Sequence, residues 1–459
     1  MLDSLSTEAP RALAARAKRS VTLRLIVIGL LVLVLLIPLM MVRSTILERA
    51  QRRAEALASV SAMWGQEQEV GGPLMVVPFD QLVQESDSVQ KLYRYHAYFL
   101  PEELVVQAEI EPERRQRGIF ETVVYRTRLT LAGRFAKPDF DALGVAAESV
   151  RWDQAFLSFG VPDLRGVTSA LAVDWDGRKI DLEPGAGVMD PWRSGIHAAL
   201  PGLDRLAKDQ PSPFRLELTL HGSESLKVLP LGRQTHVEMT STWPDPSFRG
   251  AYLPARRQVS EQGFQAEWEV SELGRGFPQV WRSDDTDHPT FAQAVRSSAL
   301  GVGLFLPADG YHRTERALKY GILFLLLTFA TCFLFEVFHP VRLHPVQYLF
   351  VGAALCLFYL LLLALSEHFG FGLAYAAASA GTVALIGGYS RAILKARGRA
   401  VMLAAALAGL YGYLWVLLQA EDYALLLGAT ALFVILGVAM FLTRGVDWYV
   451  GKTVAEEVG

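Results

Sequence analysis

The sequence predicts a membrane protein in which six transmembrane α-helices carry a large, antiparallel β-rich domain of the sandwich type. Two observations lead to this fold class. Six apolar stretches are long enough to cross a bilayer, one near the N-terminus and five close together near the C-terminus. Between the first and the second lies a long polar region in which apolar residues often recur at every second position, as in half-buried strands.

A helix that spans the hydrocarbon core needs about 20 mostly apolar residues. The first stretch is longer than the apolar core of a typical signal peptide, and no small-x-small cleavage site follows it. We therefore interpret it as an uncleaved anchor. The six predicted spans are residues 25–42, 320–338, 346–365, 369–389, 400–418 and 423–443.

Lysine and arginine are distributed unevenly over the short segments that flank these spans. They precede the first span, and they recur after the second, fourth and sixth spans. The two remaining short loops, residues 366–368 and 419–422, carry acids and neither lysine nor arginine. Because positively charged flanks stay in the cytoplasm, both termini are predicted to be cytoplasmic and the polar region extracytoplasmic.

The spacing of Ile46, Ala50, Leu57 and Trp64 predicts that the first helix continues beyond the membrane. The loops between the last five helices are short, so sequential helices should be antiparallel neighbours. The predicted organisation is a cytoplasmic tail (1–24), the first span with a helical extension (25–64), the β-rich domain (65–316), a five-helix bundle (317–443) and a cytoplasmic tail (444–459).

Small residues recur every fourth position on the fourth and fifth predicted helices. On the fourth helix they are Ala376, Ala380, Ala384 and Gly388. Small residues at this spacing let helix backbones approach closely, so we expect this row to face a neighbouring helix.

The polar region contains clear strand patterns. Apolar and polar residues alternate through residues 214–220 and again through residues 264–270, which predicts strands with one buried and one solvated face. Asp176 and Gly177 separate two short runs and predict a two-residue hairpin turn. The region is long enough for one β-domain or for two, and the sequence leaves both possibilities open.

Composition excludes several classes of function. The only cysteines, Cys332 and Cys356, lie in apolar runs, so the β-rich domain cannot contain a disulfide bond. A net charge of -3 gives no reason to expect nucleic-acid binding. No hydrolase or zinc motif is present, and the glycines at residues 445 and 451 are spaced too widely for a phosphate-binding loop. We therefore predict no cofactor, metal or nucleotide.

One polar cluster lies beside the second and third predicted helices. Glu336, His339, Arg342 and His344 follow one another closely, and Glu336 and His339 share a helix face. Ionisable groups at membrane depth could relay protons or bind a divalent cation. The alternative is structural: Glu336 lies one turn from the interface, where it could reach water or pair with Arg342, and the two His-Pro pairs could merely shape a tight loop. Glu367 and His368, at the other end of the third helix, form a weaker candidate site, and a short polar loop explains them as well.

Several segments resemble the CreD family of bacterial inner-membrane proteins. The most distinctive is TWPDPSFRGAYLPARRQVSEQGFQAEW at residues 242–268. Others follow in the family's order along nearly the whole chain: GPLMVVP at 72–78, RLHPVQYL at 342–349, LLLALSEHFGF at 361–371, FLTR at 441–444 and DWY at 447–449.

The resemblance implies a Gram-negative inner-membrane protein that supports cell-envelope integrity. Members of the family belong to the output of a two-component regulatory system and are connected with tolerance of colicins and β-lactams. The family implies neither a reaction nor catalytic residues.

We therefore expect a non-enzymatic protein that responds to envelope stress and acts through its periplasmic domain. Its expected partners are the lipid bilayer and an unidentified periplasmic or envelope component. The alternative is a proton-coupled transporter or translocator that uses the helix bundle. The interiors of the last three predicted helices contain no charged residue, which favours the first interpretation.

Overall fold

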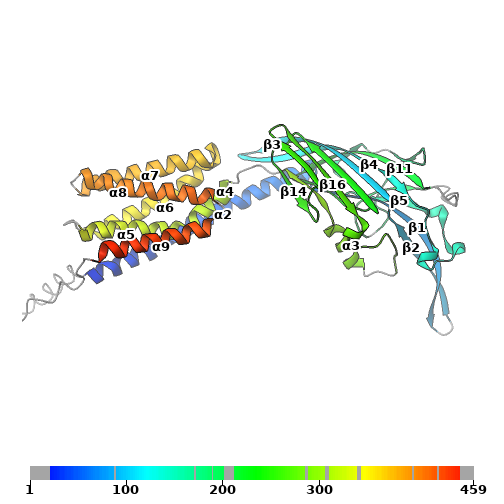
Figure 1. The fold of residues 1–459 in the computed structure, drawn as a ribbon, viewed down its shortest axis with the longest axis horizontal. Coiled ribbons are helices and arrows are strands. Elements are labelled where there is room, and N and C mark those ends of the chain that lie inside the picture. Colours follow the sequence, from blue (N-terminus) through cyan, green and yellow to red (C-terminus); the bar gives the residue numbers. More distant parts are fainter. Residues whose placement is uncertain are drawn as a thin grey trace, which may run out of the picture. The chain divides into compact units, whose positions relative to one another are not determined.

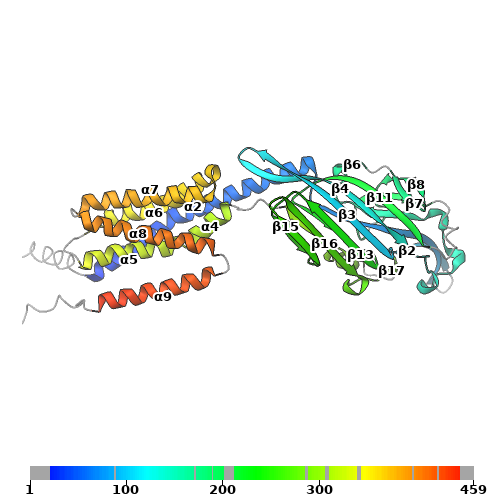
Figure 2. The same ribbon diagram turned by 45° about the horizontal axis from the view of Figure 1, so that its top comes forward.

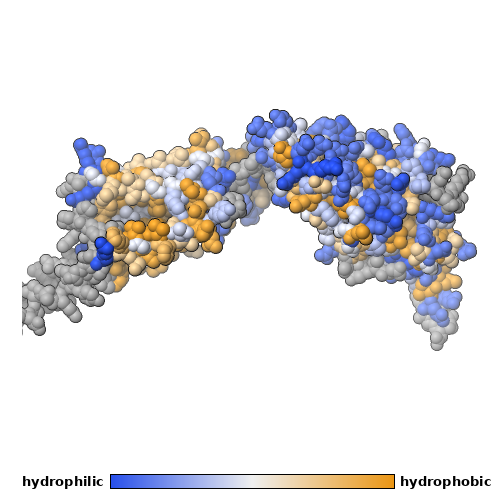
Figure 3. All heavy atoms as spheres, viewed as in Figure 1, coloured by the Kyte–Doolittle hydropathy of each residue, from blue (hydrophilic) through white to orange (hydrophobic). Residues whose placement is uncertain are grey.

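The computed structural model describes residues 21–86, 89–169, 172–188, 190–200, 211–284, 288–304, 310–338, 343–394, 397–420 and 423–444. The chain divides between Arg52 and Arg53 and between Pro307 and Ala308 into two compact units. We call them the helical unit and the β-unit. On the face shown in Figure 3, the surface of the helical unit is largely hydrophobic and that of the β-unit is largely hydrophilic.

The first described helix, α2, runs unbroken through the first predicted span and its extension, and its last turns belong to the β-unit. The other helices of the helical unit lie roughly parallel to its N-terminal part (Figures 1 and 2). The helices are α2 (Val21–Trp64), α4 (Gly310–Lys319), α5 (Gly321–Phe338), α6 (Pro345–Phe369), α7 (Phe371–Leu394), α8 (Arg397–Gln419) and α9 (Ala424–Thr443).

The boundaries of the units differ from the predicted domain limits at residues 65 and 316. Thr314, Ala317 and Leu318 of α4 are buried, and α4 packs on α6, α7 and α8. The α4 helix therefore belongs to the helical unit, although its charged face gives it the composition of the polar region.

Four helices of the described chain are long and apolar enough to span a membrane: Leu23–Trp64, Pro345–Phe369, Phe371–Ala392 and Arg397–Gln419. A fifth span results if α4 and α5, which are bent by 46° at a short break, are counted together. The stretch Ala424–Val438 of α9 is apolar but shorter. Figure 2 shows α9 at the margin of the unit.

The predicted small-residue row of α7 does not face a neighbouring helix. Ala376, Ala380, Ala384 and Gly388 are all exposed. The buried positions of α7 are Phe371, Ala374, Tyr375, Ala378, Thr382, Ile386 and Ser390. Alanines occupy both sides of this helix, so their spacing did not identify the packed side.

The β-unit is built of two sheets. In Figures 1 and 2 the sheet that contains β3, β4, β11, β13 and β16 lies over the sheet that contains β1, β2 and β5. The first sheet, in spatial order, contains β14 (Pro246–Gly250), β18 (Leu300–Leu304), β12 (Ser225–Val228), β1 (Gln68–Ser86), β5 (Phe156–Gly160), β10 (Gly195–Ala199) and β9 (Glu183–Pro184), with β2 (Val89–Phe99) beside β1 and β17 (Val280–Arg282) beside β2.

The second sheet contains the alternating runs recognised in the sequence. Residues 214–220 lie in β11 and residues 264–270 in β16, and in both strands the apolar residues are the buried ones. In spatial order the sheet contains β15 (Arg256–Ser260), β16 (Gly263–Ser271), β13 (Gln234–Ser241), β3 (Glu103–Arg117), β4 (Phe120–Phe135), β11 (Ser212–Ser223), β7 (Ala172–Trp175) and β8 (Arg178–Asp181), with β6 (Val167–Ser169) beside β11.

Both sheets contribute to one continuous hydrophobic core. Val76 and Leu157 enter it from the first sheet, and Leu129, Leu216 and Trp268 from the second. A short helix, α3 (His288–Ser297), adds Phe291 and Val295 to this core. The β-unit is therefore a sandwich.

The sequence predicted antiparallel sheets, but two of the described strand pairs are parallel. The described strand pairs are antiparallel except that β1 runs parallel to β12 and β3 runs parallel to β13. A parallel pair needs a long crossover connection. Here more than a hundred residues separate the two strands of each pair.

Candidate functional site

The Glu336 carboxylate joins three helices inside the helical unit. It lies near the end of α5, and its side chain is only 3% exposed. Its Oε1 accepts a hydrogen bond from a guanidinium nitrogen of Arg24, on α2, at 2.7 Å. Its Oε2 accepts a hydrogen bond from the hydroxyl of Tyr348, on α6, at 3.3 Å.

This arrangement satisfies both carboxylate oxygens. A buried charge is tolerated when it is paired and hydrogen-bonded, and a guanidinium is the strongest such partner for a carboxylate. Arg24 itself is 31% exposed, so its charge still reaches the surface of the unit. The Glu336 site thus holds α2 and α6 against α5.

Two members of the predicted cluster, His339 and Arg342, lie outside the described residues. His344 is exposed and caps the start of α6. Its Nδ1 accepts a hydrogen bond from the backbone N–H of Val346 at 3.3 Å, and its own backbone N–H donates to Gln347 Oε1 at 3.0 Å. With Pro345 at the first helical position, these contacts fix the beginning of α6.

The second candidate pair, Glu367 and His368, lies in the last turn of α6 rather than in a loop. The hydroxyl of Tyr311, on α4, donates to Glu367 Oε1 at 2.8 Å, and Arg49 Nε, on α2, lies 3.9 Å from the same oxygen. His368 is exposed beside Phe369. The structure therefore brings Glu367, but not His368, into a polar contact with other helices.

Both carboxylates contact the same helix, α2, at two positions on either side of its apolar stretch. Arg24 and Arg49 are 25 residues apart, which at 1.5 Å per residue corresponds to about 37 Å along the helix. This length exceeds the ~30 Å thickness of a hydrocarbon core. Between them, Leu35 packs so closely on α6 that a Cβ at Gly352 would collide with its side chain. The two sites therefore fix α2 above and below its apolar stretch.

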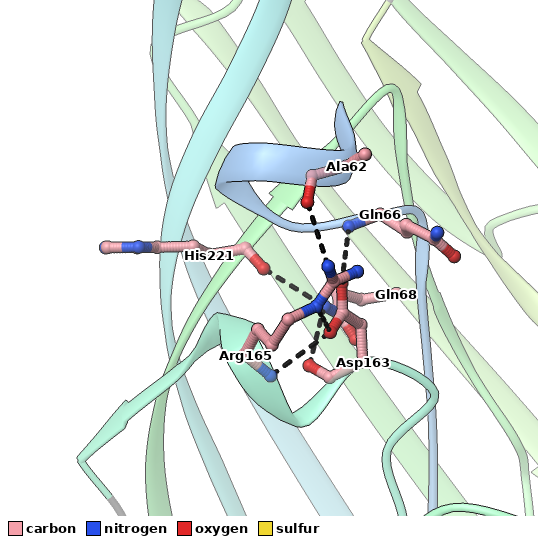
Figure 4. A network of polar contacts seen from close by, with 6 residues as sticks. All are labelled: Ala62, Gln66, Gln68, Asp163, Arg165 and His221. Carbon is pink, nitrogen blue, oxygen red and sulfur yellow. Dashed lines mark hydrogen bonds and ion pairs between the residues drawn. The ribbon is translucent and has the colours of Figure 1, made fainter. Parts of the chain in front are cut away.

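The end of α2 is fixed to the β-unit by a separate polar network (Figure 4). Arg165, in a 3-10 turn at Leu164–Gly166, donates to the carbonyl oxygen of Ala62 at 3.0 Å and pairs with Asp163 at 2.9 Å. The backbone N–H of Gln66 donates to Asp163 Oδ2 at 3.2 Å. Hydrogen bonds from Arg165, together with those from backbone N–H groups, lower the pKa of Asp163.

Aromatic contacts reinforce this joint. The Trp64 ring stacks on His221 with ring centroids 4.5 Å apart, and the Arg115 guanidinium lies 4.4 Å from the Trp64 ring centroid. Trp64 Nε1 donates to the carbonyl oxygen of Tyr125 at 3.2 Å. Burial, together with the positive charges of Arg126 and Arg115, lowers the pKa of His221. The last turn of α2 is thus packed against β3, β4 and β11.

Sequence reasoning identified Glu336 and Glu367 but missed their partners. In the sequence, Arg24 indicates only which side of the membrane the N-terminus lies on, and Tyr348 lies within a predicted apolar span. The six-span topology did contain a usable signal, because it places residues 24 and 336 on the same side of the membrane. No comparable signal marked Asp163 and Arg165. Among the described residues, no three metal-ligating side chains form a cluster.

Comparison with known proteins identifies the family. The model of the family "Inner membrane protein CreD" matches residues 20–449. Inner membrane protein CreD of Escherichia coli (strain K12) is 39% identical over 421 residues, which cover 90% of either chain. The chain belongs to the CreD family. The resemblance recognised in its sequence is therefore confirmed, and this CreD-family protein is a multi-pass protein of the inner membrane.

One solved structure with a weak overall likeness does not bear on this assignment. An M1 zinc metallopeptidase from Deinococcus radiodurans matches 45% of this chain and 42% of its own, at 11% identity. Its TM-score is 0.21, too low to support a conclusion about fold or function.

Proposed function

We propose that this protein supports cell-envelope integrity and the response to envelope stress. In this proposal it crosses the inner membrane six times, its termini are cytoplasmic, and the β-unit lies in the periplasm. There it acts without catalysing a reaction, by contact with a periplasmic or envelope component. The helical unit anchors it in the lipid bilayer.

The membership of the chain in an inner-membrane family supports this proposal, as does the charge distribution of its short loops. The non-enzymatic mode rests on the sequence, which contains no recognisable catalytic motif.

The contacts of α2 carry the proposal. Glu336 and Glu367, the candidate functional carboxylates of the helical unit, each pair with an arginine of α2. The same helix continues without a break into the β-unit, where Trp64 and the Asp163–Arg165 pair hold its last turn. The polar groups of the helical unit thus serve to hold the anchor of the β-unit, which favours an anchoring role for that unit.

Cysteine accessibility tests the proposed topology. Two exposed residues are suitable positions for a cysteine: Gln84 of β1, and Arg397 at the start of α8. In intact cells with a permeabilised outer membrane, we expect an impermeant maleimide to label Gln84→Cys and to leave Arg397→Cys unlabelled. The natural thiols of Cys332 and Cys356 are buried and give a low background. Labelling of Arg397→Cys from outside would refute the six-span arrangement.

The position of Glu336 favours the alternative function, a proton-coupled transporter. Glu336 is an ionisable side chain inside an apolar helical unit, and such residues often belong to ion pathways. Glu336→Gln distinguishes the two functions, because an anchoring site needs the contacts of this residue whereas a proton relay needs its ionisation. At matched membrane abundance, we expect Glu336→Gln to restore β-lactam tolerance to a strain that lacks the protein. Loss of tolerance at normal abundance would favour the transporter.

A further inference from the structure

A partly open crevice lies between four helices at one end of the helical unit. It is formed by the last turns of α5 and α7 and by the first turns of α6 and α8. This is also the end of the unit at which Glu336 joins α5 to α2 and α6. Almost all of the surface that lines the crevice is apolar. The lining residues include Cys332, Phe335, Tyr348, Val351, Tyr389 and Leu403.

This crevice has the chemistry of a site for hydrocarbon. The chain is a multi-pass protein of the inner membrane, so lipid surrounds its helices. Acyl chains are as apolar as leucine side chains, and they gain dispersion contacts when they fill a space between helices. Water and small anions need hydrogen-bond partners, which an apolar wall does not offer. An acyl chain is therefore the occupant that the wall of the crevice favours.

Arginine side chains supply positive charge at the same end. Arg391 follows Ser390, which lines the crevice, and Arg399 lies one turn before Leu403, on the same face of α8. Arg397 is the first described residue of α8. Arg391 and Arg397 are exposed, and Arg399 is half-buried. Figure 3 shows hydrophilic surface where α7 ends and α8 begins, beside the hydrophobic sides of both helices.

This positive charge is not balanced within the described part of the chain. Helices α7 and α8 contain neither aspartate nor glutamate. Glu336, the carboxylate at this end of α5, is already paired with Arg24. No described residue forms an ion pair or a hydrogen bond with the side chain of Arg391, Arg397 or Arg399. The positive ends of two helix dipoles add to the charge, because α6 and α8 both begin here.

We propose that the crevice and these arginines form a binding site for an anionic phospholipid, with an acyl chain in the crevice and the phosphate against Arg397 and Arg399. A guanidinium offers parallel N–H donors that match two phosphate oxygens. A zwitterionic phospholipid would bring its own ammonium group next to the arginines, whereas an anionic headgroup neutralises them. A phospholipid also accounts for both features together, since its charged headgroup and its hydrocarbon chains are adjacent in one molecule. The bound lipid fills the space between α5, α6, α7 and α8.

Photolabelling of the full-length protein in lipid nanodiscs tests the proposal. The probe is phosphatidylglycerol with a diazirine in one acyl chain, added in trace amount to phosphatidylcholine discs. Label on the peptides that contain Val351 and Leu403 is divided by label on the peptide that contains Phe433, which is 79% exposed on α9 and reports the surrounding lipid. We expect this ratio to be about tenfold higher than with a phosphatidylcholine probe that carries the same acyl chain.

Two variants separate the phosphate contact from the general charge of the protein. Arg397→Gln combined with Arg399→Gln should lower the ratio nearly to that of the phosphatidylcholine probe. Arg391 and Lys395 remain in the same segment of the sequence, so the charge that orients these helices is kept. Arg43→Gln, at an exposed position of α2, is the matched control and should leave the ratio unchanged. Equal incorporation into discs and an unchanged elution volume show that the variants fold.

Competition identifies the source of the phosphate. Unlabelled phosphatidylglycerol should displace the probe, and inorganic phosphate should not. Equal ratios for the two probes would overturn the proposal, as would a double variant that keeps the full ratio. Displacement by inorganic phosphate would also overturn it, because the site would then bind a free anion and not a lipid.

Discussion

Replacing Arg24 with glutamine leaves the buried Glu336 carboxylate without its cation. Glu336 is 3% exposed, and among the described residues it would keep only the hydrogen bond from Tyr348, at 3.3 Å. Breaking a fully buried ion pair costs about 3–5 kcal/mol, and breaking an exposed pair costs at most about 1 kcal/mol. Because Arg24 is 31% exposed, we expect an intermediate loss of about 2 kcal/mol in the free energy of unfolding.

The buried cysteines provide a direct assay of this loss. Cys332 and Cys356 are 3% and 5% exposed in the core of the helical unit, and the β-unit contains no cysteine. A thiol-reactive dye therefore reports the thermal opening of the helical unit alone. For a unit of this size, about 2 kcal/mol corresponds to a fall of roughly 4–8 °C in the midpoint temperature.

Two further variants complete the test. Arg43→Gln, on the exposed side of the same helix, should leave the midpoint unchanged. Glu336→Gln combined with Arg24→Gln should lose less stability than the sum of the single variants, because each removes the same pair. A midpoint for Arg24→Gln equal to that of the unsubstituted protein would refute the reasoning, and so would additive single effects.

Three other perturbations follow from the structure. Gly352→Leu should lower the thiol-accessibility midpoint because its side chain collides with Leu35, whereas Gly381→Leu, with nothing within 4 Å, should not. Trp64→Ala removes the stacking on His221, so trypsin should cleave the end of α2 several-fold faster in limited proteolysis. Hydrogen bonds from Arg94 and Arg151 lower the pKa of Asp80 to about 2, below its unfolded value. The stabilisation is therefore present above about pH 4 and is lost as the pH falls toward 2. Hydrogen-exchange protection of the β1–β2 hairpin, corrected for the intrinsic exchange rate at each pH, should therefore fall over this range in the natural protein, and it should depend less on pH in Asp80→Asn.

Local patterns in the sequence predicted local structure well. The alternation of residues 214–220 follows directly from the two faces of a strand and is found in β11. Asp176 and Gly177 connect β7 to β8, with φ angles of +52° and +75°, which the two-residue turn requires. Long apolar runs likewise predicted the helices, because a bilayer imposes both their length and their composition.

Non-local pairing could not be predicted from the same patterns. The parallel pairs β1–β12 and β3–β13 join strands far apart in the chain, and alternation specifies a buried face but not a neighbour. The partners of Glu336 pose the same problem at the level of single side chains. Arg24 is 312 residues away, and only the packing of α2 on α5 brings the two together.

The central claim is that Glu336 anchors α2 and does not transfer protons, and exchanging its charge with that of Arg24 tests this claim most directly. The measurement is β-lactam tolerance of a strain that produces each variant at matched membrane abundance. Arg24→Glu and Glu336→Arg each set like charges against each other where the natural pair lies 2.7 Å apart, so neither single variant should restore tolerance. The double variant re-forms the ion pair in reverse and should restore it. A double variant that accumulates normally in the membrane yet restores no tolerance would contradict the claim, because it would show that function requires the carboxylate at position 336 itself.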